Sequence, residues 1–275
     1  MRIVRVDRPL GAVMAVLDGD GAVRLTGARH STELVAALVA GGTAGETGEV
    51  VSAPALLSPV SDPGKIIAVG LNYVDHAAET GRPLPDEPVI FTKFRSSIVG
   101  PGAAVRWSRR VTDGVDYEAE LGVVIGRPAR DVTPGEALSH VFGYTCLNDV
   151  SARDLQYSNG GQWVRAKSLD TFCPIGPWIT TADEVPDPQA LRISCTIGDE
   201  TLQSASTADM IFTVADLVSR LSRLFTLETG DVIATGTPPG VGWHRTPRRV
   251  LRHGDEVTVR IEGVGELRNP VVVTD

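Results

Sequence analysis

The segment from Val115 to Gly126 constrains the fold most, because acidic residues alternate with others there and then give way to an apolar run. Asp116, Glu118 and Glu120 occupy every second position, and alternate side chains of a β-strand share one face. Carboxylates lined up beside a buried segment repel one another and lose hydration unless a cation or hydrogen-bond donors lie among them. The pattern therefore predicts either a site for a hard divalent cation such as Mg²⁺, Mn²⁺ or Ca²⁺, or an edge strand with a solvated acidic face.

The composition favours a folded protein that acts on a small molecule. A chain of 275 residues with 42% hydrophobic content can bury the core of one large domain, or of one large and one small. The net charge of −8 and the lack of a basic run predict that nucleic acid is not a partner. The longest uncharged apolar stretch, residues 34–45, is too short and glycine-rich to span a bilayer, and no signal-peptide-like apolar region follows Met1. Together with three scattered cysteines and no CxxC pair, these features predict a cytoplasmic protein without membrane contact.

The pattern of turns and apolar runs predicts an α+β fold in which strands dominate. Residues 1–60 are expected to form a small α+β domain, with strands joined by the Asp18–Gly21 turn and a helix over 32–40. Three prolines between residues 54 and 63 favour an extended crossing, so the catalytic domain is expected to cover 61–275. Its expected strands cover 65–69, 118–125, 191–197, 231–235 and 256–261, and its expected helices cover 133–140, 151–157 and 213–224.

His76 and Glu79 lie three residues apart in a short segment between Gly70 and Gly81. On a helix this spacing places them on one face, where the carboxylate would fix the tautomer of the imidazole and raise its basicity. A segment of under two turns orders only against a neighbour or a ligand, as an active-site lid does. The alternative is an ordinary pair on a surface helix.

Two further residues and one turn could each take part in the chemistry of a site or have only a structural role. Asp149 is either an oxygen ligand or a helix N-cap. Lys167 is either an exposed lysine or a cation aimed at a developing oxyanion. The glycine- and threonine-rich turn of residues 230–242, which contains Thr237, has backbone amides that could hold an anionic group.

Six blocks of sequence, taken together, resemble the fumarylacetoacetate hydrolase family from about Lys65 to Val272. The blocks are GLNYVDHAAE (70–79), DYEAELGVVIG (116–126), GYTCLNDVSARDLQ (143–156), KSLDTFCPIGP (167–177), GDVIATGTPPGVG (230–242) and IEGVGELRNPV (261–271). The resemblance implies a rolled, barrel-like mixed β-sheet around a metal, usually magnesium or manganese, in a homodimer. It implies metal ligands at Glu118, Glu120 and Asp149, a water-activating dyad of His76 and Glu79, a catalytic Lys167, and substrate contacts at Tyr73, Gln156 and Thr237.

The implied activity is divalent-metal-dependent hydrolysis of a carbon–carbon bond in an acylpyruvate-like or other 1,3-dicarbonyl acid. The alternatives are an oxaloacetate-type decarboxylase or tautomerase, an isomerase of an unsaturated 2-oxo diacid, and a silent metabolite-binding member. No ligand or dyad residue is lost, which disfavours the silent member.

Two positions depart from the family pattern. Many members carry arginine where this chain has Leu71, and glycine is common where it has Ala166. Leucine offers only apolar contact in place of a guanidinium clamp. We therefore expect a substrate with a neutral or apolar distal end, unless Arg95 or another cation reaches the site.

Overall fold

The apolar run that follows the alternating carboxylates forms a central strand. A computed structural model describes residues 1–19, 21–158 and 160–275, and in it β11 (Ala119–Ile125) is buried along its whole length. It pairs antiparallel with β12 (Val141–Asn148) on one side and with β17 (Val232–Ala234) on the other. Both of its faces contribute to hydrophobic clusters, which explains an uninterrupted apolar sequence. The edge-strand interpretation is therefore wrong.

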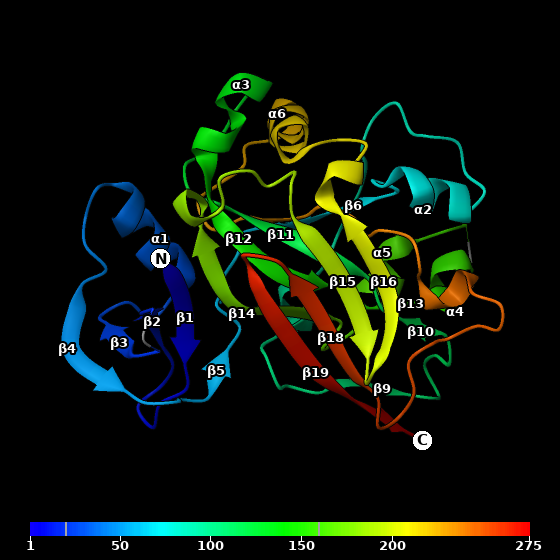
Figure 1. The fold of residues 1–275 in the computed structure, drawn as a ribbon, viewed down its shortest axis with the longest axis horizontal. Helices are drawn as coiled ribbons and strands as arrows, with labels where there is room; N and C mark the ends of the chain where they lie inside the picture. Colours follow the sequence, from blue (N-terminus) through cyan, green and yellow to red (C-terminus); the bar gives the residue numbers. More distant parts are fainter. Residues whose placement is uncertain (20, 159) are drawn as a thin grey trace.

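The largest sheet surrounds β11 and mixes parallel and antiparallel neighbours (Figure 1). Its strands run in the order β4-β3-β2-β1-β14-β12-β11-β17-β6-β7, with β5 beside β1 and β8 beside β14. The strands not yet given are β1 (Arg2–Val6), β2 (Val13–Leu17), β3 (Val23–Thr26), β4 (Glu46–Val51), β5 (Leu56–Leu57), β6 (Ile66–Gly70), β7 (Val89–Thr92), β8 (Ile98–Val99) and β14 (Cys173–Thr181). The predicted strand over 65–69 is thus β6, displaced by one residue.

A second sheet packs against the first and encloses the main core. Its order is β16-β15-β18-β19-β9, formed by β9 (Val105–Ser108), β15 (Arg192–Ile197), β16 (Glu200–Ser206), β18 (Glu256–Ile261) and β19 (Gly265–Thr274). Strands β15 and β18 contact β11, and Leu121, Val123 and Val259 share one buried cluster. A short pair, β10 (Val115–Asp116) with β13 (Ser151–Ala152), lies beside these sheets.

The N-terminal residues continue the largest sheet. Strand β1 pairs with β2 and also with β14, where Ile3 lies opposite Ile179. Helix α1 (Ser31–Val39) buries Leu34 and Val35 in the cluster that also holds Ile179. The predicted turn at Asp18–Gly21 connects β2 with β3, although Asp20 within it lies outside the described residues. The predicted domain boundary near residue 60 stays a prediction.

Helices are short inserts, so the strand-dominated α+β class is confirmed. Besides α1, the described helices are α2 (Val74–Glu79), α3 (Pro134–Ala137), α4 (Arg153–Tyr157), α5 (Trp163–Lys167) and α6 (Val214–Leu224). Short 3₁₀ turns cover Arg95–Ser97, Leu138–His140, Ala182–Glu184, Thr207–Asp209 and Gly242–His244. The helix expected over 151–157 loses its first two residues to β13, and the one expected over 133–140 ends as a 3₁₀ turn. Thr213 and Asp216 form the capping box that starts α6, as their spacing predicts.

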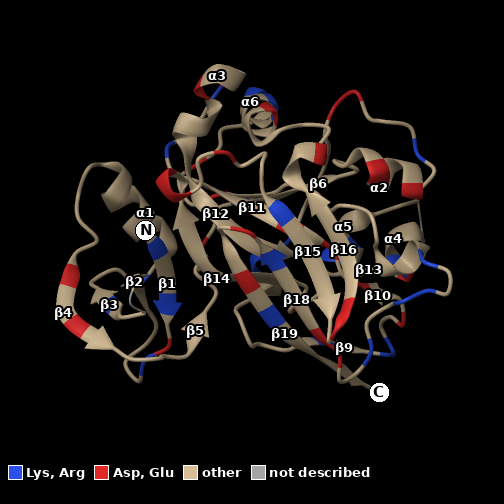
Figure 2. Ribbon diagram, in the orientation of Figure 1, with Lys and Arg blue, Asp and Glu red and all other residues tan. Residues whose placement is uncertain are grey.

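The helices, the charged residues and the cysteines can be compared with the expectations drawn from composition. None of the described helices has the length and apolar character needed to cross a membrane. Lys and Arg are interspersed with Asp and Glu over the strands and loops (Figure 2). All three cysteines are buried and free, and burial raises the pKa of Cys146 and of Cys173 to about 12. These thiols pack in the core.

Candidate active site

The carboxylates at residues 118, 120 and 149 come together where β11 and β12 pair. Ala119 lies opposite Asn148, so the residues just outside this pair, Glu118 and Asp149, become neighbours. The Asp149 amide donates to the Glu118 carbonyl at 2.9 Å, and the Asn148 side chain accepts from the Glu118 amide at 3.0 Å. One carboxylate oxygen each from Glu118, Glu120 and Asp149 lies within 4.8 Å of the others, and all three residues are buried.

Buried cations surround part of this cluster. The Lys167 ammonium lies 2.7 Å from Glu118 Oε2 and 2.7 Å from Asp149 Oδ2, and Lys93 lies 2.5 Å from Asp149 Oδ1. Asp149 is therefore not an N-cap, since α4 begins at Arg153 after Ala152. Lys167 is 2% exposed, which rules out its plain interpretation as a surface lysine.

The charges around Glu118 and Glu120 differ, and the difference suits a metal. Burial alone would raise the pKa of Glu118, but Arg153 and Lys167 outweigh it and hold that pKa below its ordinary value. The pKa of Glu120 is raised well above its ordinary value by burial and by the charges of Asp149 and Glu118. The described residues provide no ion-pair partner for Glu120, which accepts only from the Gly236 amide, at 2.9 Å. Three converging oxygens with one uncompensated carboxylate fit a hard divalent cation.

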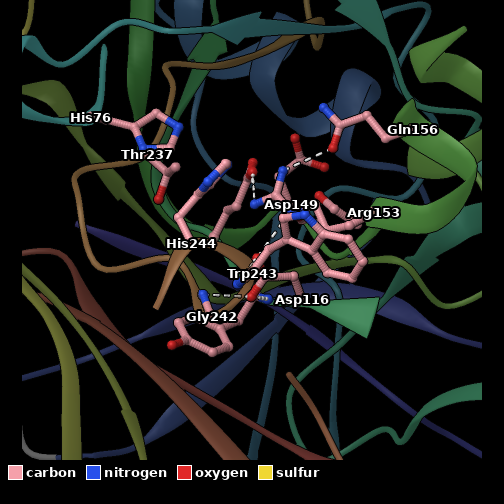
Figure 3. A network of polar contacts seen from close by, with 12 residues as sticks. His76, Asp116, Asp149, Arg153, Gln156, Thr237, Gly242, Trp243 and His244 are labelled. Carbon is pink, nitrogen blue, oxygen red and sulfur yellow. Dashed lines mark hydrogen bonds and ion pairs between the residues drawn. The ribbon is translucent and has the colours of Figure 1, made fainter. Parts of the chain in front are cut away.

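Asp116, the first of the alternating carboxylates, does not join the metal cluster. Its side chain accepts from Arg153 Nε at 2.9 Å, from the Gly242 amide at 2.8 Å and from the Trp243 amide at 3.0 Å (Figure 3). The chain leaves regular strand geometry between β10 and β11, so residues 116 and 120 are not on one continuous strand face. The expectation of three carboxylates aligned on one strand is wrong at this position.

The glycine- and threonine-rich loop after β17 binds the chain's own carboxylates. Besides the Gly236 amide on Glu120 and the Gly242 amide on Asp116, the Gly240 amide donates to Glu79 Oε1 at 2.9 Å. These backbone amides therefore hold anionic groups that belong to the protein itself, namely its own carboxylates.

The His76 and Glu79 pair forms on α2 as its spacing predicts. His76 Nδ1 lies 2.9 Å from Glu79 Oε2, and His76 is 6% exposed, so its side chain lies on the buried face of α2 and the interpretation as an ordinary surface pair is wrong. Burial would raise the pKa of Glu79, but the hydrogen bonds from His76 and Gly240 lower it. An ionised carboxylate only accepts hydrogen bonds, so in the neutral imidazole Nδ1 carries the proton and Nε2 has the lone pair.

A cavity brings most of the predicted residues together. His76, Glu118, Gln156, Lys167 and Thr237 line it, together with Leu71, Arg82, Phe91, Tyr157 and Trp163. The Thr237 hydroxyl donates to the Ala119 carbonyl at 3.0 Å and accepts from Gln203 at 2.8 Å. Tyr73 is fully buried, is absent from the lining, and its hydroxyl has no hydrogen-bond partner among the described residues. Its predicted contact with substrate stays a prediction.

Several polar residues of the site were missed from the sequence. Arg153 ties together Asp116, Glu118 and Gln156, with Nη1 donating to Gln156 Oε1 at 2.9 Å and Nη2 lying 2.6 Å from Glu118 Oε1. His244 lies 3.3 Å from the Tyr157 hydroxyl, and Figure 3 places it between His76 and Trp243. A lone Lys93 after an apolar strand, or Arg153 within a polar helix, gives no local sign of burial. The only signal was the match of the surrounding blocks to a family.

The comparison with known proteins fits this geometry. The profile for fumarylacetoacetate (FAA) hydrolase C-terminal domains matches residues 65–272. The chain belongs to the fumarylacetoacetate hydrolase family. The matched range contains all the metal-cluster and dyad residues named above, and it begins close to the predicted boundary of the catalytic domain.

Relatives within the family carry different activities in their names. The human mitochondrial oxaloacetate tautomerase FAHD2A is 48% identical over 217 residues, covering 78% of this chain and 69% of that protein. The fumarylacetoacetate hydrolase of Exiguobacterium antarcticum has a TM-score of 0.89 at 39% identity, covering 99% of each chain. The 2-hydroxyhepta-2,4-diene-1,7-dioate isomerase of Mycobacterium marinum has a TM-score of 0.82 at 39% identity, covering 99% of this chain and 98% of that one. The family thus indicates an enzyme, while its reaction, a homodimeric assembly and a cytoplasmic location stay predictions.

Proposed function

We propose that this enzyme interconverts the keto and enol forms of a 2-oxo diacid of the oxaloacetate type, with a divalent cation, Mg²⁺ or Mn²⁺, at Glu118, Glu120 and Asp149. The observation that carries the proposal is the position of His76, held by an ionised Glu79, in the cavity that Glu118 and Lys167 also line. Such a cavity pairs a base with groups that stabilise a negative oxygen. The named activity of the human relative supports the choice of substrate.

The dyad can move the proton that defines this reaction. When His76 Nε2 takes a proton from carbon 3, the electron pair of the C–H bond forms the double bond to carbon 2, and negative charge develops on the 2-oxo oxygen. Glu79 holds the imidazolium that forms, because its carboxylate accepts from Nδ1. Returning the proton to that oxygen gives the neutral enol and regenerates the base.

Lys167 provides the second function of the site. Burial would lower the pKa of Lys167, but Asp149 and Glu118 raise it above 10.5, so the side chain stays an ammonium donor. Lining the cavity, it can donate to the developing oxyanion while its carboxylate partners keep it in place. A divalent cation, when bound, would supply Lewis-acid polarisation of the 2-oxo carbonyl, worth several kcal/mol in the transition state.

Hydrolysis of an acylpyruvate, the activity expected from the sequence, is the second candidate. The observation that favours it is the same dyad, because a base fixed by a carboxylate can also deprotonate water. In that reaction hydroxide would add to the distal carbonyl, and the bond between that carbon and the neighbouring methylene would break to release an enolate.

A substrate comparison separates the two candidates. Purified enzyme with Mg²⁺ is given oxaloacetate and, separately, acetylpyruvate, and the enol absorbance and the released acid are followed. We expect enol–keto exchange of oxaloacetate to exceed the uncatalysed rate, to vanish after exhaustive chelation, and to return when Mg²⁺ is restored. Rapid cleavage of acetylpyruvate with no effect on oxaloacetate would replace the first candidate with the second. No reaction with either compound would reject both.

A further inference from the structure

We propose that Arg82 binds the distal carboxylate of the substrate and so makes the enzyme select dicarboxylic 2-oxo acids over monocarboxylic ones. This inference rests on the proposed function and goes beyond it by naming the residue that sets specificity. It also revises the expectation drawn from Leu71, which allowed for a cation that reaches the site from elsewhere.

Arg82 differs from Arg153 and Lys167 in that its side chain has no partner among the described residues. Arg153 is held by Asp116 and Glu118, and Lys167 is held by Glu118 and Asp149. The side chain of Arg82 makes no ion pair or hydrogen bond with any described residue, although it lines the same cavity. Of these cations, Arg82 is therefore the one whose charge is available to a ligand.

The acidic residues closest to Arg82 in the sequence are mostly engaged elsewhere. Glu79 accepts from His76 and from the Gly240 amide, and Glu87 lies 2.7 Å from Arg220. A guanidinium that lines a cavity and lacks a carboxylate is suited to bidentate binding of a carboxylate from a substrate.

The end of α2 fixes Arg82 relative to the dyad. The Arg82 amide donates to the Ala77 carbonyl at 3.0 Å, and the Gly81 amide donates to the Ala78 carbonyl at 3.1 Å. With Gly81 at φ +67°, these bonds form a Schellman motif, and Pro83 further restricts the backbone of Arg82. The backbone that carries Arg82 is thus built onto the same short helix that presents His76.

The cavity offers distinct environments for the two ends of a diacid. Of the charged residues that line it, Glu118, Arg153 and Lys167 are buried, whereas Arg82 is exposed. Apolar side chains, including Leu71, Phe91 and Trp163, also line the cavity, and Phe91 and Trp163 pack edge to face at 5.3 Å. Since Leu71 offers no charge, a carboxylate at the outer end of the substrate can meet its counter-charge at Arg82.

A pair of substrates that differ only in the distal charge tests this role. Oxaloacetate and its 4-methyl ester are compared with the parent enzyme, with Arg82→Met, with Arg82→Lys and with Arg95→Met, all with Mg²⁺. Arg95 is an exposed arginine that does not line the cavity and serves as the matched control. Loss of a charge-assisted hydrogen bond of this kind corresponds to roughly 10- to 100-fold in affinity.

We expect the parent to favour the diacid in kcat/KM, and Arg82→Met to reduce that preference by about 10- to 100-fold, mainly through KM. Arg82→Lys should keep part of the preference, and Arg95→Met should keep all of it. A preference unchanged in Arg82→Met, or reduced equally in Arg95→Met, would overturn the inference.

Calorimetric titration of the same two compounds into each Mg²⁺-loaded protein separates this inference from the proposed function. Tighter binding of the diacid that depends on Arg82, without turnover of either compound, would leave the inference standing and reject the proposed reaction. Turnover of oxaloacetate without a contribution from Arg82 would do the opposite. Absence of both binding and turnover would overturn both.

Discussion

Replacing Arg153 with methionine removes the cation that joins the metal cluster to its supporting network. The side chain is 3% exposed and contacts Asp116 Oδ2 at 2.9 Å, Glu118 Oε1 at 2.6 Å and Gln156 Oε1 at 2.9 Å. Removing one partner of a buried ion pair typically costs about 3–5 kcal/mol, because the remaining charges stay buried without compensation. Asp116 loses its charged partner here and Glu118 keeps only Lys167, so we expect a loss of about 3–5 kcal/mol in the free energy of unfolding near neutral pH.

The loss in the free energy of unfolding caused by Arg153→Met should grow as pH rises. In the parent, the pKa of Glu118 is lowered below 4.5, so this group contributes stability that is present above 4.5 and lost as pH falls. Without Arg153, Lys167 is the closest cation left to oppose burial, so the pKa of Glu118 moves up from its lowered value and less of that stability remains. The difference in the free energy of unfolding between parent and variant should therefore grow between about pH 3 and about pH 7, by roughly 1.4 kcal/mol for each unit by which the pKa of Glu118 moves up within that range.

Urea denaturation at both pH values, without added metal, measures this difference. Arg165→Met is the matched control, because Arg165 is an exposed arginine on the neighbouring helix α5 and should shift stability by at most about 0.5 kcal/mol. A loss below about 1 kcal/mol for Arg153→Met, or a deficit that shrinks as pH rises, would refute the reasoning that this arginine neutralises buried carboxylates.

Three further results are expected. Glu120→Gln should weaken Mg²⁺ binding by at least roughly tenfold in calorimetry while circular dichroism shows an intact fold, and full activity of Glu120→Ala after exhaustive chelation would contradict the metal assignment. His76→Ala and Glu79→Gln should each lower kcat by roughly 10² to 10⁴, and the double variant by little more than the worse single one; losses that multiply would show that the two do not act as a unit. Because the pKa of Glu120 is raised, Mg²⁺ binding should release a proton and should weaken as pH falls. Calorimetric titration in two buffers of different ionisation enthalpy detects the released proton. Mg²⁺ binding that is independent of pH would contradict the role of Glu120 as the protonated ligand.

Local patterns in the sequence predicted the features that depend on near neighbours. The strand β11 and the capping box of α6 follow from the residues within each segment. The spacing of His76 and Glu79 likewise sets their contact on α2. Asp149 was assigned through the family blocks, since no local periodicity connects it with Glu118.

The parts that could not be predicted depend on long-range packing. Lys93 is separated from Asp149 by 56 positions, and Arg153 from Asp116 by 37. Both cations follow segments that would equally suit an exposed charge, so only the three-dimensional pairing shows that they are buried. The same reason explains why Asp116 was grouped with the metal ligands: the break between β10 and β11 has no clear sequence signal.

The loop after β17 connects the two chemical functions of the site. Its Gly236 amide holds Glu120 of the metal cluster, and its Gly240 amide holds Glu79 of the dyad. Gly240 has φ +103°, and a Cβ there would lie 2.2 Å from the Leu202 carbonyl oxygen, so no other residue fits without moving the backbone. An alanine at this position would displace the amide that supports Glu79. Because Glu79 holds His76, the substitution would disturb the base even though Gly240 itself is not a catalytic residue. The rigidity of one glycine loop therefore sets the orientation of the dyad relative to the carboxylates that receive the metal.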